Sequence, residues 1–339
     1  MEFKVKDIAA ELGLSPSTVS LVLNSKPGIS EATRERVFEA LRERGYQHYR
    51  PAPQIQATIK LVICKKHGSV VSDTPFFAQL IEGIEMRSRH HGFNTIIVHL
   101  DISDNIAEQL HQVIAPGCNG LLLLATELFE PDLGRISETG LPFVVLDSYF
   151  ENMNFDTVVI NNMQGSYAAT KYLASLGHQK IGYIGSSVVI NNFLERRDGF
   201  LKAMRVRDLL VNDDYYFLVD STMEGAYRDM CVHLERFKNK GDFKATAFFC
   251  DNDIIASACM KAFKEYGFSL PEDISFIGFD DMPFCSITDP PLSTMMVPKR
   301  EMGALAVDRL ANKISGQHDE IVKIEISARL IARNSVRRL

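Results

Sequence analysis

Several features that would assign this 339-residue chain to a common class are absent. It has six cysteines, but no two form a Cys-x-x-Cys pair and no histidine stands at metal-ligand spacing from them. Four of the cysteines lie in apolar surroundings, which favours buried, reduced thiols over disulfides or a metal site. We therefore expect no metal and no cofactor.

Targeting and membrane signals are also lacking. The first residues, MEFKVKDIAAELG, contain neither an apolar core region nor a small-residue cleavage site. No segment approaches the roughly 18 consecutive apolar residues of a membrane span. The sequence predicts a cytoplasmic protein that has no membrane partner.

The common motifs of catalysis are missing as well. The chain has no G-x-x-x-x-G-K-[ST], no G-x-G-x-x-G after a strand, no G-x-S-x-G and no H-E-x-x-H. The run GYIGSS at 182–187 only weakly resembles a phosphate loop. Aspartates follow several strands, but no nucleophile stands beside a base. We expect no catalytic residues and no enzyme activity.

Composition and charge favour a folded protein of several parts. Apolar residues make up 46% of the chain, and its length suits two or three folding units. The net charge is −6, but residues 1–60 hold nine Lys or Arg and seven Asp or Glu, which leaves +2 there and −8 in the remainder. A slightly basic head on an acidic body is compatible with DNA binding.

The head has the pattern of a helix-turn-helix. We expect three helices, at residues 5–12, 16–23 and 31–44. Gly13 breaks the first, Ser15 followed by Pro16 starts the second, and Ser30 caps the third. The outer face of the second helix carries small and hydroxyl side chains, which allow a helix to enter the major groove.

This head resembles a known family. The run VKDIAAELGLSPSTVSLVLNSKPGISEATRERVFEALRERGY, residues 5–46, is similar to the head of the LacI/GalR family of bacterial repressors. The resemblance implies base contacts from Pro16, Ser17 and Leu21, and phosphate contacts from Thr18, Ser20 and Asn24. Leu21 departs from the family, which commonly has Arg there. Leu can contact only a thymine methyl, so the operator is expected to differ from the commonest half-site.

Residues 47–58 form the expected linker. Pro51 and Pro53 mark a domain boundary and could occupy only the first turn of a helix. The family usually has a hinge helix here that inserts an apolar wedge into the minor groove. In this chain the linker is short and Ile55 is the one wedge candidate. We therefore expect that no standard hinge helix forms.

From residue 59 the pattern changes to short apolar strands alternating with amphipathic helices. Nine strands are expected, at 59–64, 95–100, 120–124, 143–146, 157–160, 180–184, 215–219, 245–250 and 274–279. Such βα alternation predicts parallel sheets covered on both faces. The predicted fold class is α/β, with an N-terminal three-helix helix-turn-helix domain followed by a two-lobed, doubly wound domain.

The second part resembles the same family and the periplasmic type of binding protein. The similar stretches include VVINNMQGSYAATKYLASLGHQKIGYIG, ERRDGF and DPPLSTMMVPKREMGALAVDRL. The resemblance implies that the chain crosses between lobes near residues 292 and 322. The expected domains are 1–46 for DNA and 59–339 for effector binding and dimerisation. The first lobe would comprise 59–160 and 292–321, and the second lobe 161–291 and 322–339.

Polar residues follow several expected strands, where ligands sit in open α/β sheets. Asp147, Asn252 and Asp280 each come after such a strand, Arg196 lies near a helix start, and Phe77 opens a helix. The resemblance places the family's effector contacts on these five residues. Carboxylates, an amide, a guanidinium and an aromatic ring suit a sugar. Capping and surface pairing are the alternative roles.

The sequence predicts a DNA-binding transcriptional regulator, most simply a repressor, that is controlled by a small polar effector. We expect a homodimer on a near-palindromic double-stranded operator, because one head is too small for strong specific affinity. A nucleobase, a phosphorylated metabolite or a protein corepressor remain alternatives to a sugar. A transport-type binding protein would share the sensor but would not need residues 1–46.

Overall fold

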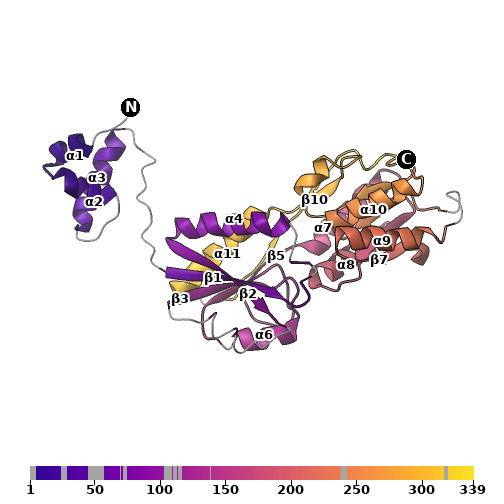
Figure 1. Cartoon of the computed structure of the whole chain (residues 1–339), viewed down its shortest axis with the longest axis horizontal. Helices are drawn as coiled ribbons and strands as arrows, with labels where there is room; N and C mark the ends of the chain where they lie inside the picture. Colours follow the sequence, from indigo (N-terminus) through magenta and orange to yellow (C-terminus); the bar gives the residue numbers. More distant parts are fainter. Residues whose placement is uncertain are drawn as a thin grey trace.

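The computed structural model describes most of the chain. The described residues are 5–23, 29–44, 57–68, 70–71, 75–102, 109, 113, 117–137, 139–237, 243–316 and 320–339. They form a three-helix head and two α/β lobes (Figure 1). The predicted fold class is confirmed. Among the described helices, none combines the length and the hydropathy that a membrane crossing requires.

The head consists of α1 (Val5–Leu12), α2 (Pro16–Leu23) and α3 (Glu31–Glu43). Gly13 takes a φ of 65° in the turn between α1 and α2, a conformation that glycine adopts at little cost. The Ser15 hydroxyl then accepts the N–H of Thr18 at 3.0 Å and caps α2. The three helices enclose a core of their own, formed by Ile8, Ala9, Val19, Val22, Leu23, Val37, Ala40 and Leu41.

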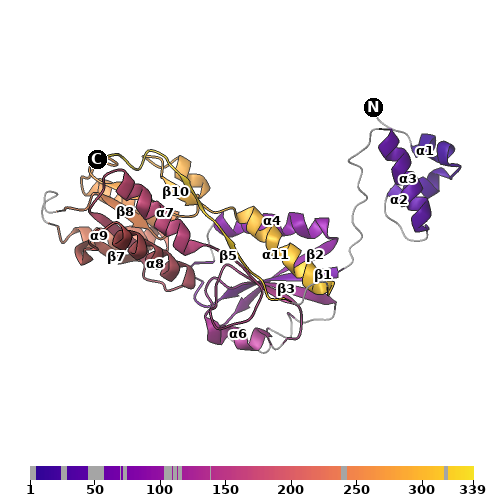
Figure 2. The same ribbon diagram turned by 180° about the vertical axis from the view of Figure 1, so that it is seen from behind.

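The first lobe is built on a six-stranded parallel sheet with the order β11-β5-β4-β3-β1-β2. Its strands are β1 (Ala57–Lys65), β2 (Phe93–Asp101), β3 (Cys118–Leu124), β4 (Phe143–Leu146), β5 (Thr157–Ile160) and β11 (Lys323–Ile326). Helices α4 (Pro75–His90) and α11 (Lys299–Ile314) lie side by side on one face, and α6 (Glu130–Ser137) lies on the other (Figures 1 and 2). The sheet is therefore covered on both faces, as parallel strands with few polar residues require.

The second lobe contains a four-stranded parallel sheet with the order β7-β6-β8-β9. Its elements are α7 (Asn162–Ser175), β6 (Ile181–Ser186), α8 (Asn191–Val206), η1 (Asp213–Tyr215), β7 (Tyr216–Val219), α9 (Met223–Leu234), β8 (Ala247–Cys250), α10 (Asp253–Glu265), β9 (Ser275–Ile277) and η3 (Pro283–Ser286). Its core is rich in phenylalanine, and the rings of Phe248, Phe263 and Phe276 pack against one another. Aromatic packing of this kind buries a large apolar area with few residues.

The chain crosses from the second lobe to the first, and later back to the second, at residues further along the chain than predicted. Strand β10 (Thr294–Met296) pairs antiparallel with β12 (Arg329–Ile331), and Met296 forms a bridge with Asp280 of the second lobe. The first return therefore falls between β10 and α11, after the predicted position near 292. Strand β11 pairs with β5 of the first lobe. The prediction that residues 322–339 belong wholly to the second lobe is wrong for this strand.

Candidate effector site

The five predicted effector residues lie around one cavity between the lobes. Phe77, Asp147, Arg196, Asn252 and Asp280 all line it, and it holds about 430 Å³ of empty space, part of which is open to solvent. Residues that are distant in the sequence meet here because the carboxyl ends of parallel strands of both sheets face the junction.

Asp147 follows β4 and is almost fully buried. Its carboxylate accepts the hydroxyl of Thr126 at 2.7 Å and the side-chain amide of Asn192 at 3.2 Å. Burial raises the pKa of Asp147 to about 7, although these hydrogen bonds and the charge of Arg196 act in the opposite direction. The Asn192 bond joins the two lobes, because Asn192 belongs to α8.

Arg196 lies on α8 with 3% of its surface exposed. It donates from Nε to Asn162 at 2.9 Å, from Nη1 to the carbonyl of Asp251 at 2.6 Å and from Nη2 to Asp280 at 3.2 Å. The guanidinium also lies over the Phe279 ring, 3.9 Å from its centroid. Three acceptors and an aromatic face fix the orientation of this cation.

A glycine brings Arg196 to this place. Gly199, one turn after Arg196, packs against α7, and a Cβ at that position would collide with the hydroxyl of Ser166 and the carbonyl of Met163. The close approach of the two helices sets Arg196 beside Asn162, the first residue of α7. The run ERRDGF therefore combines a polar side chain with the small residue that positions its helix.

Asp280 follows β9 with a φ of 108°, far from the values that side chains other than glycine prefer. Its backbone N–H donates to the carbonyl of Met295 at 2.8 Å, and its carbonyl accepts a hydrogen bond from Lys299 of the first lobe. Burial raises the pKa of Asp280, and the charges of Arg196 and Lys299 oppose this. Strained backbone held by its surroundings in this way is common at binding sites.

Asn252 and Phe77 complete the predicted set. The side-chain oxygen of Asn252 accepts the N–H of Ile255 at 2.9 Å and caps α10, which was the alternative role. The same residue lines the cavity. Phe77 is buried in the first turn of α4, edge-on to Phe76. The two rings form part of the apolar wall.

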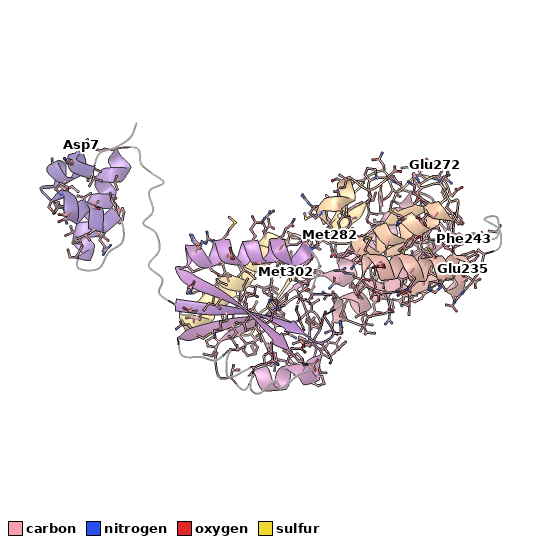
Figure 3. All side chains as sticks on the ribbon, in the orientation of Figure 1. Asp7, Glu235, Phe243, Glu272, Met282 and Met302 are labelled. Carbon is pink, nitrogen blue, oxygen red and sulfur yellow. The ribbon has the colours of Figure 1, made fainter. Side chains whose placement is uncertain are left out.

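Several lining residues were not predicted. Thr126 and Asn192 are polar, and the apolar ones are Val70, Phe76, Ile190, Phe193, Ile254 and Met282. Met282 is labelled at the junction of the lobes in Figure 3. Ile190, Asn192 and Phe193 share one segment at the start of α8. The alternation of polar and apolar side chains in this segment did not identify them as cavity residues, because the start of any surface helix has the same pattern.

The predicted DNA-binding residues of the described head lie on α2. Pro16 and Ser17 are exposed, Leu21 is 39% exposed, and Thr18 and Ser20 are half-buried. They face away from the core side chains of the same helix. Asn24 and Ile55 lie outside the described residues, so the predictions for the phosphate contact and the hinge wedge remain predictions.

No cysteine is among the described residues that line the cavity. All six cysteines are free thiols, and burial raises the pKa of Cys64 to about 12. Within the described ranges, no group of three or more His, Cys, Asp or Glu side chains is arranged to hold a metal ion.

Comparison with known proteins agrees with this architecture. Residues 4–48 match the model of the bacterial regulatory proteins of the lacI family, and residues 170–336 match a periplasmic binding protein-like domain. The HTH-type transcriptional repressor PurR of Aliivibrio salmonicida is 32% identical over 340 residues, which cover 99% of each chain. The chain belongs to the LacI family of bacterial regulatory proteins. PurR of Pasteurella multocida is 31% identical over 98% of each chain.

Solved structures of this LacI-family type share the fold over nearly the whole chain. The transcriptional regulator CelR in complex with cellobiose has a TM-score of 0.74 and 25% identity, and covers 98% of this chain and 100% of its own. A LacI family regulator from Enterococcus faecium with bound ribose has a TM-score of 0.69 and 28% identity, over 83% of this chain and 99% of its own. The protein is a DNA-binding transcriptional repressor of the LacI family. Both PurR relatives are named as transcriptional repressors.

Proposed function

We propose that this repressor binds a near-palindromic operator as a homodimer and that a small effector in the interlobe cavity controls its operator affinity. Pro16, Ser17 and Leu21 would contact bases, because they are the outward side chains of α2. Thr18, Ser20 and Asn24 would contact phosphates. A dimer is needed because a single head of this size gives too little specific affinity.

We infer further that the effector is an uncharged polyhydroxylated molecule of monosaccharide size. The observation that carries this inference is the lining itself: the carboxylates Asp147 and Asp280 and the guanidinium Arg196 converge between phenylalanine side chains. Carboxylates accept hydrogen bonds from hydroxyls, Arg196 can donate to a ring or hydroxyl oxygen, and a phenyl ring covers an apolar sugar face. The solved relatives that carry cellobiose and ribose support this class.

The charge of the lining disfavours a phosphorylated metabolite. Among the described residues that line the cavity, Arg196 is the one cation, and it is already bonded to Asp280. A phosphate placed there would face two carboxyl groups with no unpaired cation to neutralise it.

A thermal-shift panel tests the effector class. The purified protein would be heated with monosaccharides, disaccharides, nucleobases and sugar phosphates, because a molecule that binds only the folded state raises Tm. We expect a monosaccharide to raise Tm and to change operator affinity in a gel shift. An increase in Tm with nucleobases alone would show that the effector is a nucleobase and not a sugar. No increase in Tm with any member of the panel would favour a protein corepressor.

The DNA-binding part has a separate test. Sedimentation of the complex with upstream DNA of its own locus should show two chains for each operator. Replacement of Ser17 should change base preference at single positions, whereas a uniform loss over all sequences would indicate a phosphate contact. A monomer that keeps tight and specific binding would contradict the dimer.

A further inference from the structure

Glu127 is a buried carboxylate that the cavity does not use. It follows Thr126 in the turn after β3, and its side chain has no exposed surface. The carboxylate lies inside the loop that leads from β1 to α4. Oε2 accepts the backbone N–H groups of Lys66 at 3.0 Å, His67 at 3.1 Å and Gly68 at 2.8 Å. Oε1 accepts those of Val70 at 2.9 Å and Val71 at 3.1 Å.

Five backbone donors around one side chain require an ionised carboxylate. Burial raises the pKa of Glu127, but its hydrogen bonds with the backbone of residues 66–68 and 70 outweigh burial, and the pKa is lowered overall. Among the other residue types only aspartate carries a carboxylate, on a side chain one methylene shorter. Glutamine has one oxygen, and its amide nitrogen would face N–H donors that it cannot accept.

The loop held by Glu127 forms one side of the effector cavity. Val70 lines the cavity and packs in one apolar cluster with Ile190 and Phe193 of the second lobe. Both partners also line the cavity, at the start of α8. The apolar seam formed by Val70, Ile190 and Phe193 is therefore a contact between the lobes at the cavity wall.

The same turn also reaches the polar side of the cavity. Thr126, the residue before Glu127, donates to Asp147 at 2.7 Å. Asp132 in α6 accepts Lys66 Nζ at 2.8 Å and the N–H of Phe129 at 2.9 Å, which fastens the start of the loop to the same segment. Two adjacent residues thus hold two sides of the cavity. Glu127 holds the loop that carries the apolar Val70, and Thr126 holds the carboxylate of Asp147.

We propose that Glu127 is a positioning residue: its carboxylate fixes the backbone of residues 66–68, 70 and 71 so that Val70 closes the effector cavity against Ile190 and Phe193. The proposal rests on the proposed function only in taking the ligand of this cavity to be the effector. Its consequence is that the loop is shaped from inside by a residue that never contacts the ligand.

Amide hydrogen exchange tests the first part without any ligand. Glu127→Gln should speed exchange of the amides of Lys66, His67, Gly68, Val70 and Val71 by about tenfold or more, because each loses its charged acceptor. Glu130→Gln is the matched control, since Glu130 lies three residues away and bonds Asn152 outside the loop. Its loop amides should exchange as in the wild type.

Two outcomes would overturn the proposal. One is a Glu127→Gln loop that exchanges no faster than the Glu130→Gln loop. The other is acceleration spread evenly over β1, β3 and β4, which would show a general loss of stability rather than local positioning. No ligand is present when exchange is measured in the two variants. The exchange result can therefore be interpreted even if the sugar panel fails, and the sugar panel can be interpreted even if the exchange prediction fails.

Tryptophan fluorescence tests the second part, the seam. The chain has no tryptophan, so Phe193→Trp adds a single reporter. Adding Val70→Ala or Glu127→Gln to this variant should red-shift the emission and increase acrylamide quenching, whereas Glu130→Gln should do neither. The Val70→Ala protein should keep slow exchange at residues 66–68. An emission that Glu127→Gln leaves unchanged would contradict the link between Glu127 and the seam.

Discussion

At the scale of single residues, Arg196 is the most informative position in the cavity. We predict that Arg196→Ala lowers effector affinity by about a hundredfold or more, because a buried, oriented guanidinium is lost. Operator affinity without effector should stay near wild type, since the head has its own core. Calorimetry and gel shifts measure the two quantities.

Arg197→Ala is the matched control. The Arg197 side chain is next to Arg196 in the sequence, but it is 41% exposed and contacts Asp198 instead of the cavity. Arg196→Lys keeps the positive charge but loses the planar guanidinium with its paired N–H donors, and this variant should also bind the effector weakly. Normal effector binding by Arg196→Ala would show that the cavity is not the effector site.

Asp147 makes effector binding depend on pH. Its pKa of about 7 lies above the ordinary 3.8 because the carboxyl is buried, so raising the pH from 6 to 8 ionises it in the folded protein. An ionised carboxylate accepts hydroxyl donors best, and we predict that effector affinity rises over this interval with release of protons. Calorimetry in two buffers of different ionisation enthalpy measures the release.

Asp147→Asn should flatten the profile. This variant also separates Asp147 from Asp251 and Asp253, two further buried carboxyl groups whose pKa values burial raises to about 7. A profile that stays equally steep in Asp147→Asn would assign the titration to one of them or to Asp280, whose pKa burial also raises. The carboxyl groups of Asp147, Asp251 and Asp253 contribute a loss of stability as the pH rises from about 4 to 7, since in the unfolded chain they release their protons first.

At the scale of elements, Asn252 has two roles that substitution can separate. Its oxygen caps α10, and Asn252→Ala should lower the free energy of unfolding by about 1 kcal/mol, the usual value of a lost N-cap. Asn252→Ser retains a capping oxygen but has no amide nitrogen. We predict that the serine variant unfolds near the wild-type Tm and binds effector more weakly. Urea unfolding and calorimetry give both numbers, and unchanged binding by the serine variant would leave Asn252 with the cap alone.

The elements also show how far the sequence leads. β4 and β5 were predicted at their observed bounds because all their residues except Thr157 are apolar, and fully buried strands have that pattern. β11 was missed because KIEI is half polar and lies at the edge of its sheet. The error in the second lobe boundary follows directly from that miss.

The residues in and around the cavity also differ in whether the sequence could predict them. The residues at strand ends could be predicted, because parallel sheets bring those ends together. Glu127 follows β3 in the same way, but it was not predicted, because its partners are backbone N–H groups of a distant loop. Its burial arises because the backbone of residues 66–68, 70 and 71 surrounds it, a tertiary arrangement with no local pattern.

At the scale of the whole molecule, the polar contacts of the cavity connect the lobes. Asn192 of the second lobe donates to Asp147 of the first, and Lys299 of the first lobe donates to the carbonyl of Asp280 in the second. An effector that replaces or strengthens these bonds shifts the population of lobe arrangements. The head is joined to the first lobe, ahead of β1, so a change in lobe angle in a dimer alters the spacing of the two heads.

This coupling has a thermodynamic consequence that does not depend on the sign of regulation. If effector changes operator affinity by some factor, operator must change effector affinity by the same factor, because both describe one closed cycle. We predict equal factors when calorimetry of effector with and without saturating operator is compared with operator titrations with and without effector. Asn192→Ala should reduce both factors together, since it removes a bond between the lobes. Unequal factors in the wild type would show a further state, such as dissociation of the dimer, and would contradict a two-state change of lobe angle as the whole mechanism.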